Sequence, residues 1–548
     1  MPYVNVPNDL SKIKTKIAFN LTKRQLICFG AGAAIGVPTY LLTRQAIGNT
    51  GALFAMLTIM LPAFLLAMYE KDGLPFEKVI RNIIRVKFTH PGIRPYRTEN
   101  IYAPFVRKEE PIEQNKKQKN ANKHRALSAQ QTIPYIAMHP DGICQLPGGL
   151  YTKTLEYEDI NYAVASTEDQ TAIISGWSAC LNYFDSSLPF QLSFVNRRSR
   201  NANRYKVNIP AQEDDFNSIR GEYVEMLKGQ IAKSNNGIER YKYITFGLPA
   251  EGVAEARPRL WRVEADVMGN LKRLGVQSRP LDGRDRLAVL HGQMHPGGRE
   301  PFRFVWKDIP KTGMGTKDYI APDSFDFRQS RTFRVGQMWG AASYLQIMAS
   351  ELSDKLLAEI LELDAELTVT MHIQTVDQLK AIKTIKGKIS DIGRMKAEEQ
   401  KKAVRAGYDM EILPPDLITF SKDAAELLSD LQSRNERMFL LTFTVVNLAP
   451  TRQRLENDVF TVSGIAQKYN CAVKRLDWQQ EQGYMSSLAL GYNGIEIQRG
   501  MTTSSTAIFV PFTTQELFQN GKEALYYGIN ALSNNLIMVD RKLLKNPN

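Results

Sequence analysis

Cysteine is scarce in this sequence. The 548 residues include four cysteines, none in a C-x-x-C spacing, which argues against a structural zinc site and a disulfide framework. The chain also lacks a G-x-x-x-x-G-K-[ST] motif, so it contains no phosphate-binding loop of the Walker A type. With 43% apolar and 23% charged residues, it is neither wholly disordered nor collagen-like. Its length allows roughly three or four domains, and we expect the water-soluble part to be cytoplasmic.

Other catalytic patterns are missing as well. His291 and His295 are four residues apart, but no glutamate completes an H-E-x-x-H motif, so we interpret them as turn residues. No G-x-S-x-G elbow is present. One acidic cluster ends an amphipathic helical pattern and is expected to face water: Glu359, Glu362, Asp364 and Glu366. We therefore predict no catalytic, cofactor-binding or metal-binding residue, and no enzyme activity for this chain by itself.

Positive charge is concentrated near the N-terminus. The formal net charge is +13, and residues 1–132 hold 20 Lys plus Arg against 8 Asp plus Glu. The rest of the chain is close to neutral. The binding partner of this basic charge must therefore be sought in the N-terminal segment.

The same segment contains the two longest apolar runs. Residues 26–42 and 51–69 carry no charge, and each approaches the length needed to cross a hydrocarbon core about 30 Å thick. Pro38 and Pro62 interrupt them, which membrane helices tolerate better than water-soluble ones. We predict a two-helix transmembrane hairpin. The alternative is a buried hairpin of a soluble protein.

Cations at both ends of this hairpin predict its orientation, because Lys and Arg next to membrane spans are retained in the cytoplasm. The connection between the spans holds only Arg44. We expect both termini and the large domain to be cytoplasmic, with the protein in the bacterial inner membrane. A cleaved signal peptide is the weaker alternative, since it leaves the second run unexplained. The membrane-interface residues we predict are Lys23, Arg24, Arg81 and Arg85.

Residues 75–88 have the pattern of an amphipathic helix. Phe76, Ile80 and Ile84 share one face, and Arg81 and Arg85 lie opposite. This pattern favours a helix at the membrane surface with its cations near anionic headgroups. The alternative is an amphipathic helix packed on the following domain.

Several N-terminal stretches resemble the PrgI family of short, two-span membrane proteins of conjugative elements in Gram-positive bacteria. They are MPYVNVPNDL, FNLTKRQLICFG, AMYEKDGLPFEKVIRNIIRV and RPYRTENIYA. The resemblance covers about residues 1–105, and we assign 1–106 as the membrane domain. It implies a place in the inner-membrane platform of a type IV secretion system, with other secretion subunits and further copies of this chain as partners.

Residues 107–132 are polar and predict a solvated linker at a domain boundary. Its basic side chains are candidates for weak contact with nucleic acid or lipid: Lys116, Lys117, Lys119, Lys123 and Arg125. The alternative is that they only face solvent.

From residue 133 onward, short strand-like and helical patterns alternate, which predicts an α+β (mixed α/β) fold. We expect an α+β domain over 133–315, in which 286–294, RLAVLHGQM, is a strand. A helix-rich mixed domain should follow over 316–500, with SYLQIMASELSDKLLAEILEL helical. Residues 376–407 predict an exposed or coiled-coil-like arm for packing against neighbours, or alternatively a helical hairpin without a partner.

The last fifty residues, beginning TTSSTAIFVPF, resemble the stretch that leads into the phosphate-binding loop of VirB-type conjugation ATPases, the TraC, TrbE and CagE relatives. TKTLEYEDINYAVAS resembles their N-terminal region, so the likeness covers about 133–548. It implies that 501–548 form the opening strands of a truncated RecA-like domain, with ATP and Mg²⁺ held only by motor residues beyond Asn548.

These observations predict an inner-membrane subunit of a conjugative type IV secretion system that anchors and assembles a VirB-type ATPase. One alternative is an NTPase that becomes active when a downstream P-loop domain completes it. Another is a membrane-anchored protein that contacts the transferred DNA, with salt-sensitive binding centred on 107–132.

Overall fold

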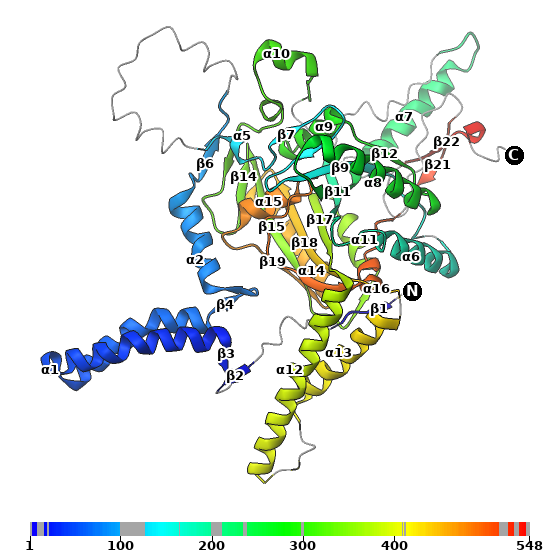
Figure 1. Ribbon diagram of the computed structural model, residues 1–548. Coiled ribbons are helices and arrows are strands. Elements are labelled where there is room, and N and C mark those ends of the chain that lie inside the picture. The colour runs from blue at the N-terminus through cyan, green and yellow to red at the C-terminus, as the bar shows by residue number, and fades with distance from the viewer. Residues whose placement is uncertain are drawn as a thin grey trace, which may run out of the picture.

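The computed structural model describes residues 3–7, 16–18, 21–98, 127–163, 165–198, 211–233, 238–297, 301–407, 409, 413–433, 435–513, 524–530 and 536–543. A large sheet lies at the centre of this part of the chain (Figure 1). Its fourteen strands follow the order β6-β13-β14-β15-β18-β17-β10-β11-β9-β8-β7, while β12, β19 and β20 pair with β9, β15 and β18. The pairings within it are antiparallel.

The strands of this sheet, in chain order, are β6 (Ile93–Pro95), β7 (Ala137–Met138), β8 (Cys144–Gln145), β9 (Leu150–Tyr157), β10 (Phe190–Arg198), β11 (Ile238–Pro249), β12 (Ser278–Pro280), β13 (Ser324–Asp326), β14 (Phe333–Val335), β15 (Met338–Ile347), β17 (Glu366–Thr375), β18 (Met438–Ala449), β19 (Cys471–Arg475) and β20 (Arg499–Thr502). Four small antiparallel pairs accompany it: β1 (Tyr3–Asn5) with β16 (Glu351–Ser353), β2 (Lys16–Ala18) with β3 (Leu21–Thr22), β4 (Glu70–Lys71) with β5 (Leu74–Pro75), and β21 (Leu525–Ile529) with β22 (Leu536–Val539).

The α-helices are α1 (Lys23–Met68), α2 (Phe76–Ile84), α5 (Ala129–Thr132), α6 (Thr167–Leu181), α7 (Asn217–Lys233), α8 (Val253–Arg273), α9 (Gly283–Met294), α10 (Ile309–Thr312), α11 (Lys355–Leu361), α12 (Gln378–Arg405), α13 (Pro415–Ser433), α14 (Arg452–Lys468), α15 (Gln480–Ser487) and α16 (Thr503–Ala507). A π-helix (Arg85–Thr89) continues α2, and 3-10 turns occupy Trp306–Asp308, Thr316–Tyr319 and Arg541–Leu543.

Both faces of the sheet are covered, as the alternating directions of the side chains along β10 show. Phe190, Leu192 and Phe194 enter a core that includes α6, α8, α11 and α14. Gln191, between two of them, points to the opposite face, because successive side chains of a strand alternate. There its amide donates to the carbonyl oxygen of Leu488 at 2.8 Å. The second face is thus covered by α15 and the residues that follow it.

The predicted mixture of helices and strands is confirmed, but two local predictions were wrong. Residues 286–294 form most of helix α9, not a strand, and Asp282 caps it by accepting from the backbone N–H of Asp285 at 2.7 Å. Eight of the twelve residues of α9 are buried. A short helix buried on most sides loses the polar and apolar periodicity that separates helix from strand in a sequence.

The second error concerns the helical pattern predicted from Ser343. Residues up to Ile347 belong to strand β15, whose centre pairs with both β18 and β19. Helix α11 begins only at Lys355. Residues 340–345 of β15 are all buried, so side chains on both faces of this strand are covered and its sequence has no strict alternation.

Two regions named in the sequence differ in detail from their prediction. Residues 129–132, at the end of the predicted linker, form α5, where Ser128 caps the helix and Gln130 is buried. At the C-terminal end, β20 joins the central sheet through β18, while β21 and β22 form an antiparallel pair. The division into domains stays a prediction.

Candidate membrane-anchor site

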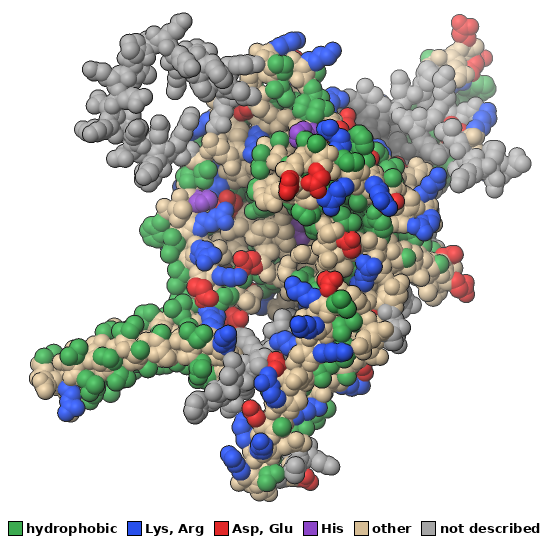
Figure 2. All heavy atoms as spheres, in the orientation of Figure 1, with side chains coloured by type: hydrophobic (Ala, Val, Ile, Leu, Met, Phe, Trp, Pro, Cys, Tyr) green, Lys and Arg blue, Asp and Glu red, His purple; other side chains and the backbone are tan. Residues whose placement is uncertain are grey.

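Helix α1 is an apolar arm that projects from the body of the molecule (Figure 1). It is the one helix in the described chain that is long and apolar enough to cross a membrane, and only 11% of its most apolar window is buried. Green side chains cover its visible surface in Figure 2. Ile35, Leu42 and Phe54 are 61%, 79% and 65% exposed. Contiguous exposed apolar patches of this kind mark sites of interaction with a membrane or with another protein.

The arm is interrupted once, at Gly48. Its φ of 71° and ψ of 169° are not helical, and this conformation is essentially restricted to glycine. The halves on either side lie against each other: the rings of Phe29 and Phe64 have centroids 5.2 Å apart. A Cβ added to Gly32 would lie 2.9 Å from the Cβ of Ala63. Small residues thus let the two backbones approach closely, as in many packed membrane helices.

The predicted spans 26–42 and 51–69 fall on opposite sides of this break. Both lie within α1 except for Tyr69, which caps the end of the helix. Pro38 and Pro62 are both inside the helix. Hydroxyl groups one turn apart along α1 donate to backbone carbonyls, for example Thr39 to Ile35 at 2.8 Å. These bonds satisfy the hydroxyl groups within the helix, as a membrane-spanning segment requires.

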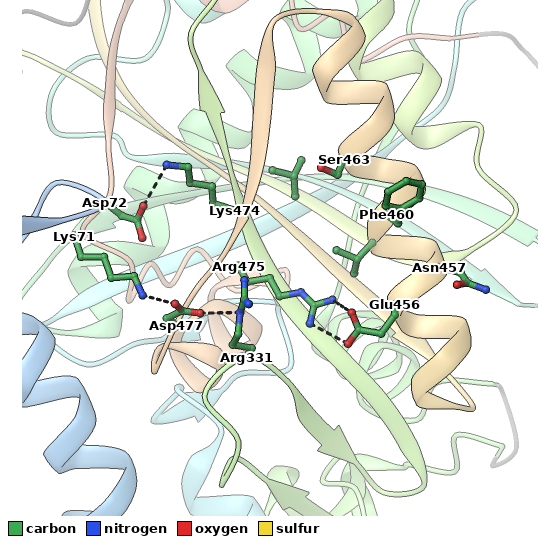
Figure 3. Close-up of a pocket in the computed structure, with 12 residues that line it drawn as sticks. Lys71, Asp72, Arg331, Glu456, Asn457, Phe460, Ser463, Lys474, Arg475 and Asp477 are labelled. Carbon is green, nitrogen blue, oxygen red and sulfur yellow. Dashed lines mark hydrogen bonds and ion pairs between the residues drawn. The ribbon is translucent and has the colours of Figure 1, made fainter.

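The chain after the arm is attached to the body by an ionic cluster (Figure 3). Lys71 forms an ion pair with Asp477. Asp477 also pairs with Arg331, whose Nε lies 3.2 Å from Oδ1 of the carboxylate. Asp72 forms an ion pair with Lys474, whose Nζ lies 3.6 Å from the Asp72 carboxylate. The hydrogen bond to Asp477 raises the pKa of Lys71. These groups line a polar pocket of about 640 Å³ between the loop after α1, strand β19 and helix α14.

A second and more deeply buried attachment joins Arg94 to Glu481. Arg94 is on the edge strand β6 and is 1% exposed. Its Nη1 and Nη2 atoms donate to the two carboxylate oxygens of Glu481 at 2.9 and 2.8 Å, which is a bidentate pair. Its remaining donors reach Thr132 at 3.0 Å and the carbonyl of Pro91 at 3.1 Å. The guanidinium is therefore paired in a fixed geometry, as a buried cation requires.

Further charges surround this pair and determine its protonation. Burial raises the pKa of Glu481, but the hydrogen bonds and charge of Arg94, with the charge of Arg85, outweigh that effect and hold the pKa below its usual value. Arg85 Nη2 lies 3.3 Å from Glu481. His90 lies 3.4 Å from Arg94, and burial lowers its pKa. Glu481 is therefore a carboxylate and His90 a neutral ring at neutral pH.

Helix α15, which carries Glu481, is held rigidly against the sheet. All eight of its residues are buried. The side chain of Gln480 accepts from the backbone N–H of Ala342 at 2.8 Å and donates to its carbonyl at 3.0 Å. His372 lies 2.8 Å from the carbonyl of Ser486. These bonds fix the carboxylate that receives Arg94, so this second attachment is made to a buried helix.

The predicted interface residues have different environments. Lys23 and Arg81 are exposed, whereas Arg24 pairs with Glu77 of α2 and Arg85 pairs with Glu481. Contacts also join α2 and the π-helix to the body: Lys78 pairs with Glu496, and Lys87 lies 5.3 Å from the ring centre of Trp478. Lys116, Lys117, Lys119, Lys123 and Arg125 lie outside the described residues.

Sequence reasoning missed Arg94, Glu481 and Asp477, because the partners are separated by several hundred positions in the chain. A weak signal was available: Arg94 is in RPYRTEN, within a stretch that resembles the PrgI family, and Asp477 and Glu481 frame the short polar segment DWQQE. Neither feature identifies a partner without the fold.

Two other groups named in the sequence also differ from expectation. His291 is buried inside α9, not in a turn, and its ring stacks on that of His295 with centroids 4.0 Å apart. Glu366 is buried at the start of β17, where it accepts from the backbone N–H groups of Arg198 and Gly297. Among the described residues, no group of three or more His, Cys, Asp or Glu side chains could hold a metal ion.

Comparison with known proteins gives one family match. Residues 5–96 match the PrgI family, described as PrgI family protein. No curated protein matches the chain. The matched segment contains α1, α2 and β6, so it includes both the apolar arm and the strand that carries Arg94. A PrgI family domain in this part of the chain is therefore confirmed, which suggests a conjugation-related membrane protein. The resemblance of 133–548 to VirB-type ATPases stays a prediction.

Proposed function

We propose, from the PrgI family match to residues 5–96, that this chain is an inner-membrane subunit of a conjugative type IV secretion system. The two halves of α1 would cross the membrane as a hairpin, and both ends of the arm would be cytoplasmic. The single observation that carries the proposal is the apolar arm itself, which lies inside the matched segment and leaves its side chains exposed.

The attachment of the arm supports an anchoring role. Lys71, Asp72 and Arg94 connect the chain after α1 to side chains far along the sequence. A membrane arm held by buried and partly buried ion pairs would keep the α+β body close to the membrane at high effective concentration. We propose that this body assembles a VirB-type ATPase there and does not itself hydrolyse nucleotide. The resemblance of 133–548 to such ATPases and the missing Walker A motif support that role.

Cysteine accessibility in cells tests the anchor. Cys28 is replaced by alanine, since the other three cysteines are buried, and Asn49→Cys is introduced beside the break in α1. We expect a membrane-impermeant maleimide to label Asn49→Cys in intact cells that express the full chain. The matched control, Ala425→Cys on the exposed surface of α13, should react only after the membrane is opened. The chain should also stay with the membrane in alkaline carbonate. A cysteine at 49 that is protected in intact cells, or a chain that carbonate releases, contradicts the proposal.

A further inference from the structure

A second projecting element of this molecule is the arm formed by helices α12 and α13. The two helices pack through their own small core, which includes Ala381, Ile385, Ile392 and Leu427. The charges are unevenly divided between them. Helix α12 carries nine basic and three acidic residues, whereas α13 carries one lysine and four acidic residues. The arm thus has one strongly basic helix.

Three exposed lysines and two exposed aliphatic residues of α12 share one face, which we call the stripe. Lys383, Lys386 and Lys401 are exposed, as are Leu379 and Val404 near the two ends of the helix, which are 79% and 53% exposed. With 3.6 residues per turn, these five positions fall within about 60° of one another. The residues that face α13 lie on the opposite side of the helix. Exposed lysines on one face of a helix are attracted to an anionic lipid surface.

This stripe is on the side of the arm that faces α1 in Figure 1, because α13 lies on the other side of α12 in that view. The axis of α12 runs across that of α1, and Lys and Arg side chains follow the arm in Figure 2. If α1 crosses the membrane, a helix that runs across its axis at its base runs along the membrane surface. At about 1.5 Å per residue, the 28 residues of α12 would extend over several headgroups.

We propose that this stripe of α12 rests on the anionic lipid headgroups of the membrane that holds α1. The inference rests on the proposed function, because it needs α1 in the membrane. The lysines would be drawn to the negative surface, while Leu379 and Val404 would enter the boundary between headgroups and acyl chains. A nucleic acid would use the cations alone, since its phosphates offer no apolar surface, so the two exposed aliphatic residues favour lipid. The arm then sets the height and tilt of the α+β body above the membrane.

The test uses the full chain, with Cys28→Ala, in phospholipid vesicles. Ser390→Cys, which is exposed within the stripe, is labelled with an environment-sensitive NBD fluorophore, and Ala425→Cys on α13 is the control position. We expect the emission maximum of the label at 390 to shift to the blue when the vesicles contain one quarter phosphatidylglycerol. It should not shift in vesicles of pure phosphatidylcholine. The label at 425 should not respond. Each cation near an anionic surface changes the ratio of docked to free arm about fivefold.

Two triple variants of equal charge separate the stripe from the total charge of the helix. Lys383→Gln, Lys386→Gln and Lys401→Gln together should lower the docked-to-free ratio roughly a hundredfold and abolish the shift. Lys388→Gln, Lys396→Gln and Lys402→Gln, which lie on other sides of α12, should retain it. An equal loss of the fluorescence shift in both triple variants overturns the inference.

The remaining outcomes distinguish this inference from the proposed function. A chain that resists carbonate while the label at 390 is insensitive to phosphatidylglycerol overturns the docking of α12 and leaves the anchor intact. A label that responds to duplex DNA in a salt-sensitive way, but not to anionic lipid, also overturns it, in favour of nucleic acid. Release of the chain from both vesicle types by carbonate overturns the anchor and the docking together.

Discussion

Replacement of Arg94 by methionine should loosen the attachment of the membrane arm. The substitution leaves the Glu481 carboxylate, which is 8% exposed, with Arg85 at 3.3 Å as its remaining cation. Removal of one partner from a buried ion pair costs about 3–5 kcal/mol. Since Arg85 still compensates part of the charge, we expect Arg94→Met to lower the free energy of unfolding by about 3 kcal/mol. Glu481→Met, which leaves the guanidinium with neutral partners only, should cost at least as much.

The double variant decides whether this reasoning is correct. Replacement of both charges by methionine removes the uncompensated charge, so the double variant should lose less stability than either single variant. The measurement is urea unfolding of the full chain in detergent, followed by tryptophan fluorescence, because Trp478 contacts Lys87 beside the pair. Lys422→Met, at an ion pair with Glu426 in which both side chains are exposed, is the control and should leave the unfolding midpoint unchanged. If the two single losses simply add in the double variant, the pair does not couple the arm to the body.

The pair also has a predictable pH dependence. The pKa of Glu481 is lowered in the folded protein, so its stabilisation is fully present above the unfolded value, about 4.3, and is lost as the pH falls through the folded value. The difference in stability between the native chain and the double variant should therefore shrink below about pH 4. A difference that stays constant from pH 7 to pH 3 would mean that the pKa of Glu481 is the same in the folded and the unfolded chain, and would contradict this reasoning.

Two other predictions concern the arm and the sheet. Gly48→Val places a branched side chain where φ is 71°, at a cost of about 1–3 kcal/mol. It should therefore reduce cross-linking between cysteines introduced at positions 29 and 64. The control is Gly30→Val, where an added Cβ has no close contact, and it should leave this cross-linking unchanged. Burial lowers the pKa of His372 to about 4 from about 6.5, so the unfolded chain binds the proton first and stability should fall by about 2 kcal/mol between pH 7.5 and pH 5. His372→Gln should flatten that part of the urea-unfolding profile, and an unchanged slope would show that the ring is charged in the folded protein.

The sequence predicted what depends on local pattern. The apolar runs in residues 26–69 have the composition of a long apolar helix, and residues 376–407 have the spacing of charged and apolar residues that a helix requires; α1 and α12 form there. Helix α9 and the start of β15 were assigned wrongly because burial on several sides removes the periodicity that identifies an element.

The contacts of the candidate site were beyond sequence reasoning for a different reason. Arg85 was assigned to lipid headgroups because cations that follow a membrane span usually lie there, yet it contacts Glu481, which is 396 positions away in the chain. Only the topology of the sheet brings β6 and α15 together. Arg94 illustrates the same limit, since a buried arginine cannot be told from an exposed one by its neighbours in the sequence.

The strands on either side of the arm have a mechanical consequence. Strand β1, before α1, pairs with β16, and strand β6, after α1, pairs with β13 at one end of the central sheet. A lever fastened at a single point can swivel, whereas one fastened at two separate points transmits torque. After α1 the described chain is fastened twice, by Lys71 with Asp477 and by β6 with β13. A rotation of the arm would therefore load both attachments, and a twist of the central sheet would reach the arm through them.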